Sequence, residues 1–319
     1  MNNKDQNRER KTKTIISITL IILAVYTLIS GCGTNGGKQT RDALQIIDNA
    51  LVSYLGPEGT YTEEAAQFFF GDNAAFIPRS TVQEAIEDVV AGNADYAVIP
   101  QENTLGGAVV NYVDGLIAQD DIFVVGEVIL PISQTLMGIP GTALEDIKLV
   151  CSHAQGIKQS EQWRKEHMPD ADTQEMGSTA AAASYVAEAK DKTIAAIAAP
   201  GAAKLYGLSV LAENVQITDA NKTRFYVLSS VKPEETGTNA VFVASCEANK
   251  IDDIIVEIHN AGLELVTIHD RPEGSFLGSY NYILEVECKN GITDKQLKSV
   301  TGFSEIRYLG SYGVMEKYN

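Results

Sequence analysis

The chain has 319 residues, a formal net charge of -17 and four cysteines. So acidic a protein lacks the basic stripes that bind nucleic acid or an anionic membrane surface, and neither is an expected electrostatic partner. The cysteines are too scattered for a disulfide framework, and no CxxC pair or zinc-ligand spacing occurs, so no metal site is predicted.

Residues 1–31 have the pattern of a bacterial lipoprotein signal peptide. Five basic residues precede an apolar run from Ile15 to Ile29, which ends at Ser30-Gly31-Cys32. The run is short for a spanning helix, which needs roughly 20 residues. We expect lipidation of Cys32, a tether over residues 32–48 and a location on the extracytoplasmic face of the cell membrane. An uncleaved anchor and a simple secretory signal stay open as alternatives.

Residues 49–230 alternate short apolar runs with helical patterns, which is typical of an α/β fold. Strands are predicted over 51–55, 96–99, 147–151 and 193–198, with an extended run over 122–139 and a strand after Asn221. A loop is expected over 100–106. Helices are predicted after Thr60 and Thr81, over 108–118, from Ser152 to about His167, after Ser178, and from Pro200 to Gly207. The starts at Thr60, Thr81 and Ser152 have capping-box spacing.

The C-terminal part follows a linker-like stretch over 232–238. Its predicted elements have the order β-α-β-β-α-β, which is the ferredoxin-like pattern. They cover residues 240–246, 251–261, 264–269, 280–287, 294–300 and 305–309. Its first and third strands should be antiparallel, so Cys246 and Cys288 would lie at opposite edges of the sheet. No disulfide is expected between them.

Hydroxyl and amide side chains gather where predicted strands end and helices begin. In open α/β sheets ligands bind at this edge, where helix N-termini offer unpaired N–H groups. Such donors suit a small molecule with carboxylates. Helix capping uses the same residue types and is the alternative for each start taken alone. The residues are Thr60, Thr62, Asn103, Thr104, Ser152, Gln155, Ser178 and Thr179.

Motifs for nucleophilic or nucleotide chemistry are missing from the sequence. It has no Gly-x-Ser-x-Gly elbow, P-loop or Gly-x-Gly-x-x-Gly fingerprint. Cys151 and His153 could form a Cys-His pair, but a helix start at this point is the favoured interpretation.

Six motifs, in order, resemble those of the prephenate dehydratase family. They are 55–62 (LGPEGTYT), 99–104 (IPQENT), 152–155 (SHAQ), 178–182 (STAAA), 195–198 (AAIA) with 206–208 (YGL), and 221–225 (NKTRF). The resemblance implies a two-lobed catalytic domain of periplasmic-binding-protein type II over 49–230. It continues into an ACT-like regulatory or dimerisation domain over 238–319, and it implies a homodimer or homotetramer.

The resemblance also implies a reaction, the conversion of prephenate to phenylpyruvate in phenylalanine biosynthesis, without a cofactor. Thr223 would hydrogen-bond the departing hydroxyl, Arg224 would anchor a carboxylate through a bidentate fork, and Phe225 would wall the ring. The residues expected to bind substrate are Thr60, Asn103, Thr104, Ser152, Gln155, Ser178, Thr179 and Asn221.

The sequence departs from the family pattern at several positions. Gln101 replaces the usual Ile and adds a polar group near the site; Thr104, Ala154 and Thr218 replace Ser, Pro and Gln. In the ACT-like domain His269-Asp270-Arg271-Pro272 stands where Glu-Ser-Arg-Pro binds phenylalanine. The usual Gly-Ala-Leu is replaced by residues 249–253. Phenylalanine is therefore an effector expected from the resemblance alone.

Three further functions are compatible with these patterns. The enzyme could act on arogenate, the amino analogue of prephenate. The chain could be a non-catalytic lipoprotein that binds a small molecule, although such a receptor has no use for Thr223 as a proton donor. It could also be an amino-acid sensor built on the ACT-like domain with an inactive catalytic region.

Overall fold

The structure is a computed structural model that describes residues 47–218, 220–234 and 236–318. The expected signal peptide, Cys32 and the tether up to residue 46 lie outside the described residues. Within the described part of the chain, no helix is both long and apolar enough to cross a membrane.

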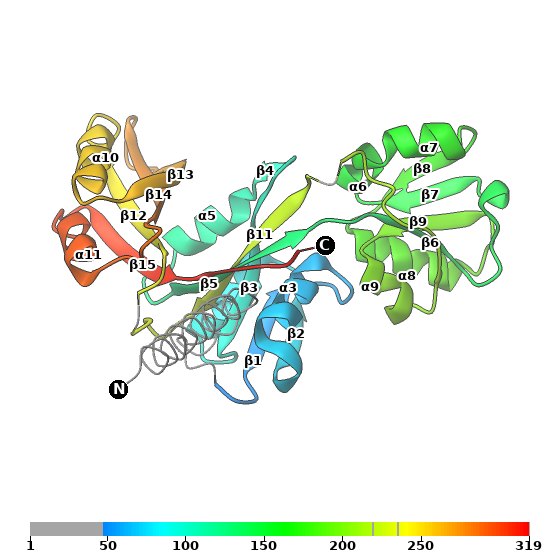
Figure 1. The fold of residues 1–319 in the computed structure, drawn as a ribbon, viewed down its shortest axis with the longest axis horizontal. Coiled ribbons are helices and arrows are strands. Elements are labelled where there is room, and N and C mark those ends of the chain that lie inside the picture. The colour runs from blue at the N-terminus through cyan, green and yellow to red at the C-terminus, as the bar shows by residue number, and fades with distance from the viewer. Residues whose placement is uncertain (1–46, 219, 235, 319) are drawn as a thin grey trace, which may run out of the picture. The chain divides into compact units, whose positions relative to one another are not determined.

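The first sheet forms one lobe of the region expected to be catalytic (Figure 1). Its strands run in the order β16-β5-β11-β3-β1-β2, with β4 paired to β3. The strands are β1 (Leu51–Leu55), β2 (Ala75–Arg79), β3 (Tyr96–Asn103), β4 (Gly107–Ala108), β5 (Phe123–Pro131), β11 (Lys222–Ser229) and β16 (Val314–Glu316). The helices are α3 (Tyr61–Phe70), α4 (Val82–Val90) and α5 (Val110–Ile117), with a short 3-10 turn, η1 (Gly71–Asn73).

The second sheet forms the other lobe, in the order β10-β6-β9-β7-β8. Figure 1 shows α6 and α7 on one side of it and α8 and α9 on the other. Its strands are β6 (Thr135–Gly138), β7 (Leu149–Ser152), β8 (Asp172–Glu175), β9 (Ile194–Ala198) and β10 (Ser209–Ala212). Its helices are η2 (Leu144–Asp146), α6 (Ala154–Gln159), α7 (Glu161–His167), α8 (Thr179–Ala189) and α9 (Pro200–Leu205). The chain crosses between the lobes twice, after β5 and before β11.

Helix starts follow the capping chemistry of the sequence at three of the four predicted caps. Thr60, Thr81 and Ser178 each accept a hydrogen bond from a backbone N–H in the first turn. The capping box predicted at Ser152 is wrong. His153 is the N-cap of α6, and its ring accepts from the Gln155 N–H, while Ser152 ends strand β7. The single helix expected to His167 is also broken at Ser160.

Several short or polar strands were not predicted. β8 is exposed along its whole length, and β2 contains a proline, so neither has the apolar alternation that identifies a strand. β4 and β10 were also missed. The loop expected over 100–106 is wrong in its first half, because β3 extends to Asn103. The extended run over 122–139 is divided into β5 and β6.

The C-terminal sheet confirms the ferredoxin-like order, with strands arranged β13-β14-β12-β15. Its elements are β12 (Asn239–Glu247), α10 (Ile251–Asn260), β13 (Glu264–Pro272), β14 (Ser279–Glu287), α11 (Asp294–Val300) and β15 (Ile306–Tyr312). Cys246 pairs with Tyr280 at the start of β14, whereas Cys288 follows its end. Both cysteines are free, as predicted.

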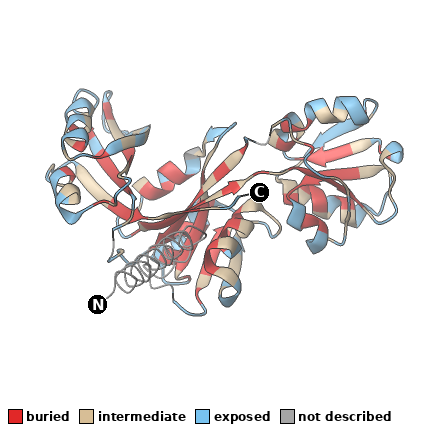
Figure 2. Cartoon of the chain, in the orientation of Figure 1, coloured by how far each residue is buried: buried red, intermediate tan, exposed pale blue. Residues whose placement is uncertain are grey.

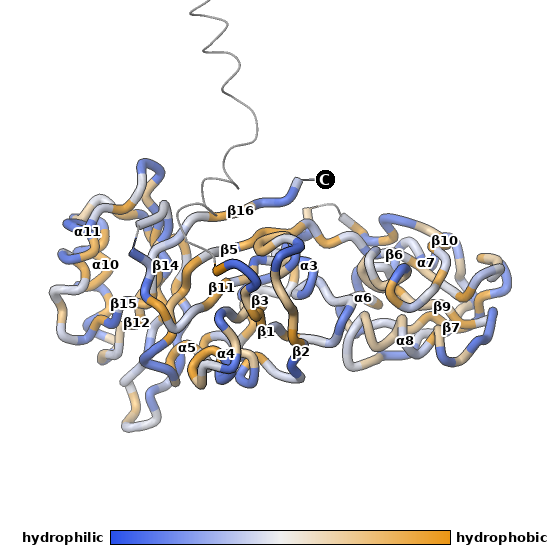
Figure 3. Tube along the Cα trace, turned by 90° about the horizontal axis from the view of Figure 1, so that it is seen from below, coloured by the Kyte–Doolittle hydropathy of each residue, from blue (hydrophilic) through white to orange (hydrophobic). Residues whose placement is uncertain are grey.

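The C-terminal domain and the first lobe share a buried apolar core. Val241, Val243 and Leu309 from the C-terminal sheet share one core with Ile99 and Tyr226 from the first sheet. Buried residues concentrate in the strands of each sheet (Figure 2), and the apolar segments follow β5, β11 and β1 (Figure 3). The two domains are therefore packed together and not merely tethered.

Gly310 lies where β15 passes against β5, before β16 joins the first sheet. It has a φ of 142°, and a Cβ there would lie 2.1 Å from the Val124 carbonyl oxygen. We expect Gly310→Ala to lower the free energy of unfolding by about 1–3 kcal/mol, because backbone atoms would have to move. Gly278→Ala is the control, since Gly278 has a φ of 95° but open space around it. Denaturant unfolding that gave equal losses for both variants would contradict the close approach.

Candidate active site

Thr223 and Asn103 face each other across two antiparallel strands. Thr223 of β11 is paired in register with Asn103 of β3. The Asn103 Nδ2 donates to the Thr223 Oγ1 over 2.9 Å, and Thr223 is 9% exposed. The Thr223 hydroxyl is the acceptor in this bond. Among the described residues none accepts its proton, so the hydroxyl can donate to a ligand.

A β-bulge at Gln101 creates this pairing. Arg224 pairs with Glu102 but Phe225 pairs with Pro100, so Gln101 is the extra residue of β3. An extra residue reverses the faces of the side chains beyond it. Without the bulge Asn103 would point to the face opposite Thr223.

Asn103 also connects the two lobes. Its Oδ1 accepts from the Gln155 Nε2 of α6 over 2.8 Å and from the backbone N–H of Gly106 over 2.9 Å. Its Nδ2 lies 2.9 Å from the Asn221 Oδ1. Four of the predicted site residues, Asn103, Gln155, Asn221 and Thr223, therefore form one hydrogen-bonded cluster.

Thr104 holds the backbone beside this cluster. Its Oγ1 donates to the Lys222 carbonyl over 3.1 Å and accepts from the Lys222 N–H over 3.2 Å. The Lys222 Nζ pairs with Glu316 of β16. Thr104 thus fixes the start of β11 next to the cluster.

The other predicted ligand donors stand at helix N-termini. Thr60 caps α3 and Ser178 caps α8, whose first residue is Thr179. Gly156 of α6 packs beside Thr179, since a Cβ on it would lie 3.7 Å from the Thr179 Cγ2. In the first lobe, the turn before α3 touches the second lobe, where the Tyr206 hydroxyl donates to the Glu58 carbonyl over 3.1 Å. In the described structure neither Thr60 nor Ser178 is hydrogen-bonded to the cluster around Thr223.

Two predicted contacts with a ligand do not fit the structure. Ser152 is fully buried and donates to the Ile197 carbonyl over 2.7 Å, so its hydroxyl serves packing between β7 and β9. Phe225 is 1% exposed and belongs to the core on the same face of β11 as Thr223, with Val128 and Leu130. A ring that deep in the core packs within the first lobe instead of lining a cavity.

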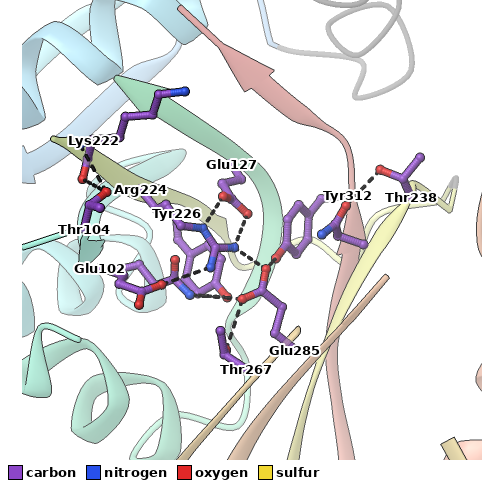
Figure 4. Close-up of polar contacts among 12 residues, drawn as sticks. Glu102, Thr104, Glu127, Lys222, Arg224, Tyr226, Thr238, Thr267, Glu285 and Tyr312 are labelled. Carbon is purple, nitrogen blue, oxygen red and sulfur yellow. Dashed lines mark hydrogen bonds and ion pairs between the residues drawn. The ribbon is translucent and has the colours of Figure 1, made fainter. Parts of the chain in front are cut away.

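Arg224 is held by three carboxylates of the chain itself (Figure 4). Its Nε and Nη2 donate to Glu127 over 2.6 and 2.9 Å, its Nη1 lies 3.3 Å from Glu102, and its Nη2 also donates to Glu285 of the C-terminal sheet. Alternation along β11 places this side chain on the face opposite Thr223. Anchoring of a substrate carboxylate by Arg224 stays a prediction that this pairing does not favour.

The charge cluster contains two carboxylates with almost no exposure. Glu127 is 1% exposed and Glu285 is fully buried. Burial raises the pKa of Glu127, and the neighbouring Glu285 carboxylate adds to the shift, while Arg224 opposes it. Neither carboxylate was predicted from the sequence. Glu127 is a charged residue inside the apolar strand FVVGEVILP, and this pattern indicates that its carboxylate has a buried partner.

The raised pKa of Glu127 has a consequence for stability against pH. A carboxyl that binds its proton more tightly in the folded state contributes stability below its unfolded pKa, about 4.3, and loses it as the pH rises. We therefore expect the unfolding free energy of wild type minus that of Glu127→Gln to fall as the pH rises above about 4.3. Denaturant unfolding across this range measures it, and a difference that rose with pH would contradict the buried, crowded carboxyl.

The predicted effector residues lie on β13, and two of them, His269 and Arg271, contact helix α5 of the first lobe. Arg271 makes a bidentate pair with Asp114 of α5 over 2.5 and 2.7 Å. The His269 ring lies edge-on to the Tyr112 ring, with centroids 6.0 Å apart, and its buried Nε2 has no hydrogen-bond partner among the described residues. Asp270 and Pro272 complete this segment, which pairs with β14.

The Cys-His pair is excluded by the position of its members. Cys151 is fully buried, which raises the pKa of its thiol. His153 is exposed and caps α6. Within the described ranges no group of three His, Cys, Asp or Glu side chains is placed to hold a metal ion.

Comparison with known proteins gives consistent matches. A profile described as prephenate dehydratase matches residues 52–233. A bifunctional chorismate mutase/prephenate dehydratase of Stutzerimonas stutzeri is 34% identical over 269 residues, which cover 82% of this chain and 72% of that protein.

Solved structures match over a similar part of the chain. The prephenate dehydratase of Arthrobacter aurescens in complex with L-Phe is 32% identical, with a TM-score of 0.75 over 82% of this chain and 90% of that one. GqqA, described as a novel type of quorum quenching acylase, is 25% identical, with a TM-score of 0.74 over 83% of this chain and 98% of that one. The two matches cover 82% and 83% of this chain. The antiparallel order of the C-terminal sheet is that of an ACT domain.

Proposed function

Since the chain belongs to the prephenate dehydratase family, we propose that it converts prephenate to phenylpyruvate in phenylalanine biosynthesis. The mechanism rests on one observation. The Thr223 hydroxyl accepts a hydrogen bond from Asn103, so its own proton can be donated to a ligand. Thr223 lies at the entry of β11, and its partner Asn103 also accepts a hydrogen bond from Gln155 of the other lobe.

The reaction is a coupled loss of carbon dioxide and water. The bond from the ring to its carboxylate breaks, and its electron pair enters the ring as the ring becomes aromatic. The carbon–oxygen bond at the opposite ring position breaks, and the hydroxyl leaves as water with one added proton. Overall, one proton is consumed and no electrons are exchanged, so the chemistry needs no redox partner.

Thr223 is the proposed donor to the departing hydroxyl. A threonine hydroxyl is too weak an acid to transfer its proton early, but a fixed donor gains strength as negative charge develops on the leaving oxygen. Asn103 orients this hydroxyl from behind. The bond to Asn103 therefore decides where the Thr223 proton points.

Substrate carboxylates are proposed to bind at neutral donors. The N-termini of α3, α6 and α8, with Thr60, Gln155, Ser178 and Thr179, offer N–H and hydroxyl groups and a partial positive charge. The ring carboxylate must be free to leave, so a strong ion pair to it would slow the reaction. Weak neutral contacts fit this requirement.

Parallel incubations of the full chain with prephenate and with arogenate test this function. Phenylpyruvate from prephenate is expected, and phenylalanine from arogenate would identify the amino analogue as a substrate. Saturable binding of prephenate without either product would overturn the enzyme and support a small-molecule-binding protein.

Phenylalanine is the effector proposed for the C-terminal domain, near His269-Asp270-Arg271-Pro272. Support comes from the Arthrobacter aurescens relative, whose structure contains L-Phe. Calorimetric titration with phenylalanine tests this, and heat that is unchanged in Asp270→Ala would place the binding site elsewhere.

A homodimer or homotetramer is the proposed assembly, which sedimentation measures directly.

Lipidation of Cys32 on the extracytoplasmic face of the membrane also remains a proposal. It rests on the lipobox-like sequence before Cys32. Incorporation of labelled palmitate that is lost in Cys32→Ala is the expected result, and equal labelling of both proteins would overturn it.

A further inference from the structure

A residue of the C-terminal domain, Glu285, is hydrogen-bonded to the bulge in β3. Gln101, the extra residue, is fully buried, and its Nε2 donates to the Tyr226 hydroxyl over 3.1 Å and to the Glu285 Oε2 over 3.2 Å. The Tyr112 hydroxyl lies beside it from α5. A buried amide at a bulge needs such partners, because an unsatisfied polar group there would cost free energy.

Glu285 is the centre of these contacts (Figure 4). It stands two residues before the end of β14 and accepts from four donors on four strands. Its Oε1 accepts from the Tyr312 hydroxyl over 3.1 Å and from Arg224, and its Oε2 accepts from the Thr267 hydroxyl over 3.3 Å and from Gln101. A carboxylate with all its lone pairs engaged has a fixed position.

Two of the partners of Glu285 belong to the catalytic domain, and both lie close in sequence to Thr223 or Asn103. Arg224 directly follows Thr223 in β11, and Gln101 lies two residues before Asn103 in β3. The bulge between them sets the face on which Asn103 meets Thr223. A shift of Glu285 would therefore move both strands at the point where the Asn103–Thr223 bond forms.

We propose that Glu285 of the C-terminal domain is a positioning residue for the dehydration, because it holds the β3 bulge and strand β11 so that Asn103 orients the Thr223 hydroxyl. This inference rests on the proposed function. It gives the C-terminal domain a part in catalysis that needs no bound effector.

The test compares Glu285→Gln in two backgrounds, wild type and Thr223→Val, in the full chain with prephenate as substrate. Glu285→Gln removes the charge and keeps the size. In the wild-type background we expect kcat to fall about 10-fold with KM changed little, as a displaced catalytic group would give. In the Thr223→Val background there is no hydroxyl left to orient, so the same substitution should change kcat by no more than about 2-fold.

A purely structural role would give equal losses in both backgrounds, and that result would overturn the proposal. So would an unchanged kcat in the single variant. Absence of phenylpyruvate from the wild-type chain would instead refute the proposed function itself, and the inference with it.

Two further variants complete the experiment. Glu287→Gln is the matched control, because Glu287 lies two residues along β14 and its side chain makes no hydrogen bond or ion pair within the described structure; its kcat should equal that of wild type. If Glu285→Gln does not fold, Gln101→Met tests the same link, since it removes the donor to Glu285 at similar volume. It should show a smaller loss of kcat that again disappears in the Thr223→Val background, and a loss of equal size in both would refute the proposal.

Discussion

Replacement of Thr223 by valine should lower kcat for prephenate by about 10²-fold or more, which is the scale of losing one preorganised donor. Valine keeps the shape of threonine and removes only the hydroxyl that receives the Asn103 hydrogen bond. Thr223 lies at the entry of β11, at 9% exposure, so the substitution should leave the fold intact. KM should change little, because the proposed bond is strongest in the transition state. Initial rates of phenylpyruvate formation over a range of prephenate concentrations measure both constants.

Thr223→Ser is the control for this variant. Serine keeps the hydroxyl and loses only the methyl group, so most of the activity should remain. Equal activity of wild type and Thr223→Val would remove Thr223 from the mechanism. A large rise in KM at unchanged kcat would give it a role in ground-state binding instead.

Replacement of Arg224 by methionine should lower the free energy of unfolding by about 3–5 kcal/mol at neutral pH, the usual cost of breaking a buried ion pair. Glu127 and Glu285 are almost completely buried, and without the guanidinium their charges would have no cation beside them. The loss should be smaller near pH 5, since the Glu127 carboxyl, whose pKa is raised by burial, can then take up a proton at less cost. Denaturant unfolding at the two pH values gives both results.

Arg271→Met is the matched control, because Arg271 pairs with Asp114 on the surface of the protein. Exposed pairs contribute little, so its stability should stay close to that of wild type. A similar small effect from Arg224→Met would contradict the buried cluster. It would also return Arg224 to the role of a free substrate anchor.

The order and type of the main elements could be predicted because local chemistry determines them. Thr60, Thr81 and Ser178 cap their helices as predicted, and the β-α-β-β-α-β order of the C-terminal domain is confirmed. The prediction failed at β8, whose residues are all exposed, because a polar edge strand has no apolar pattern. It also failed at Ser152, since its hydroxyl finds a distant backbone carbonyl that no local rule identifies.

The hydrogen-bonded pair of Asn103 and Thr223 was predicted only in part. Asn103, Gln155, Asn221 and Thr223 were each proposed, but their connection through Asn103 depends on strand register. The bulge at Gln101 sets that register, and it is stabilised by Glu285, more than 180 residues away along the chain. Arg224 was expected to meet a substrate because its charge suggests a carboxylate partner. The partners it has in the structure are the chain's own glutamates, and pairing across such distances cannot be read from a single sequence.

A single-turnover experiment tests the central claim most directly. The full chain, in excess over prephenate, is mixed and quenched, and phenylpyruvate and carbon dioxide are measured in wild type and in Thr223→Val. We predict equal amounts of both products from wild type, and bound, unreacted prephenate over the same time in Thr223→Val. Prephenate that binds to the wild-type chain and is recovered unchanged would contradict the claim that this chain is a dehydratase.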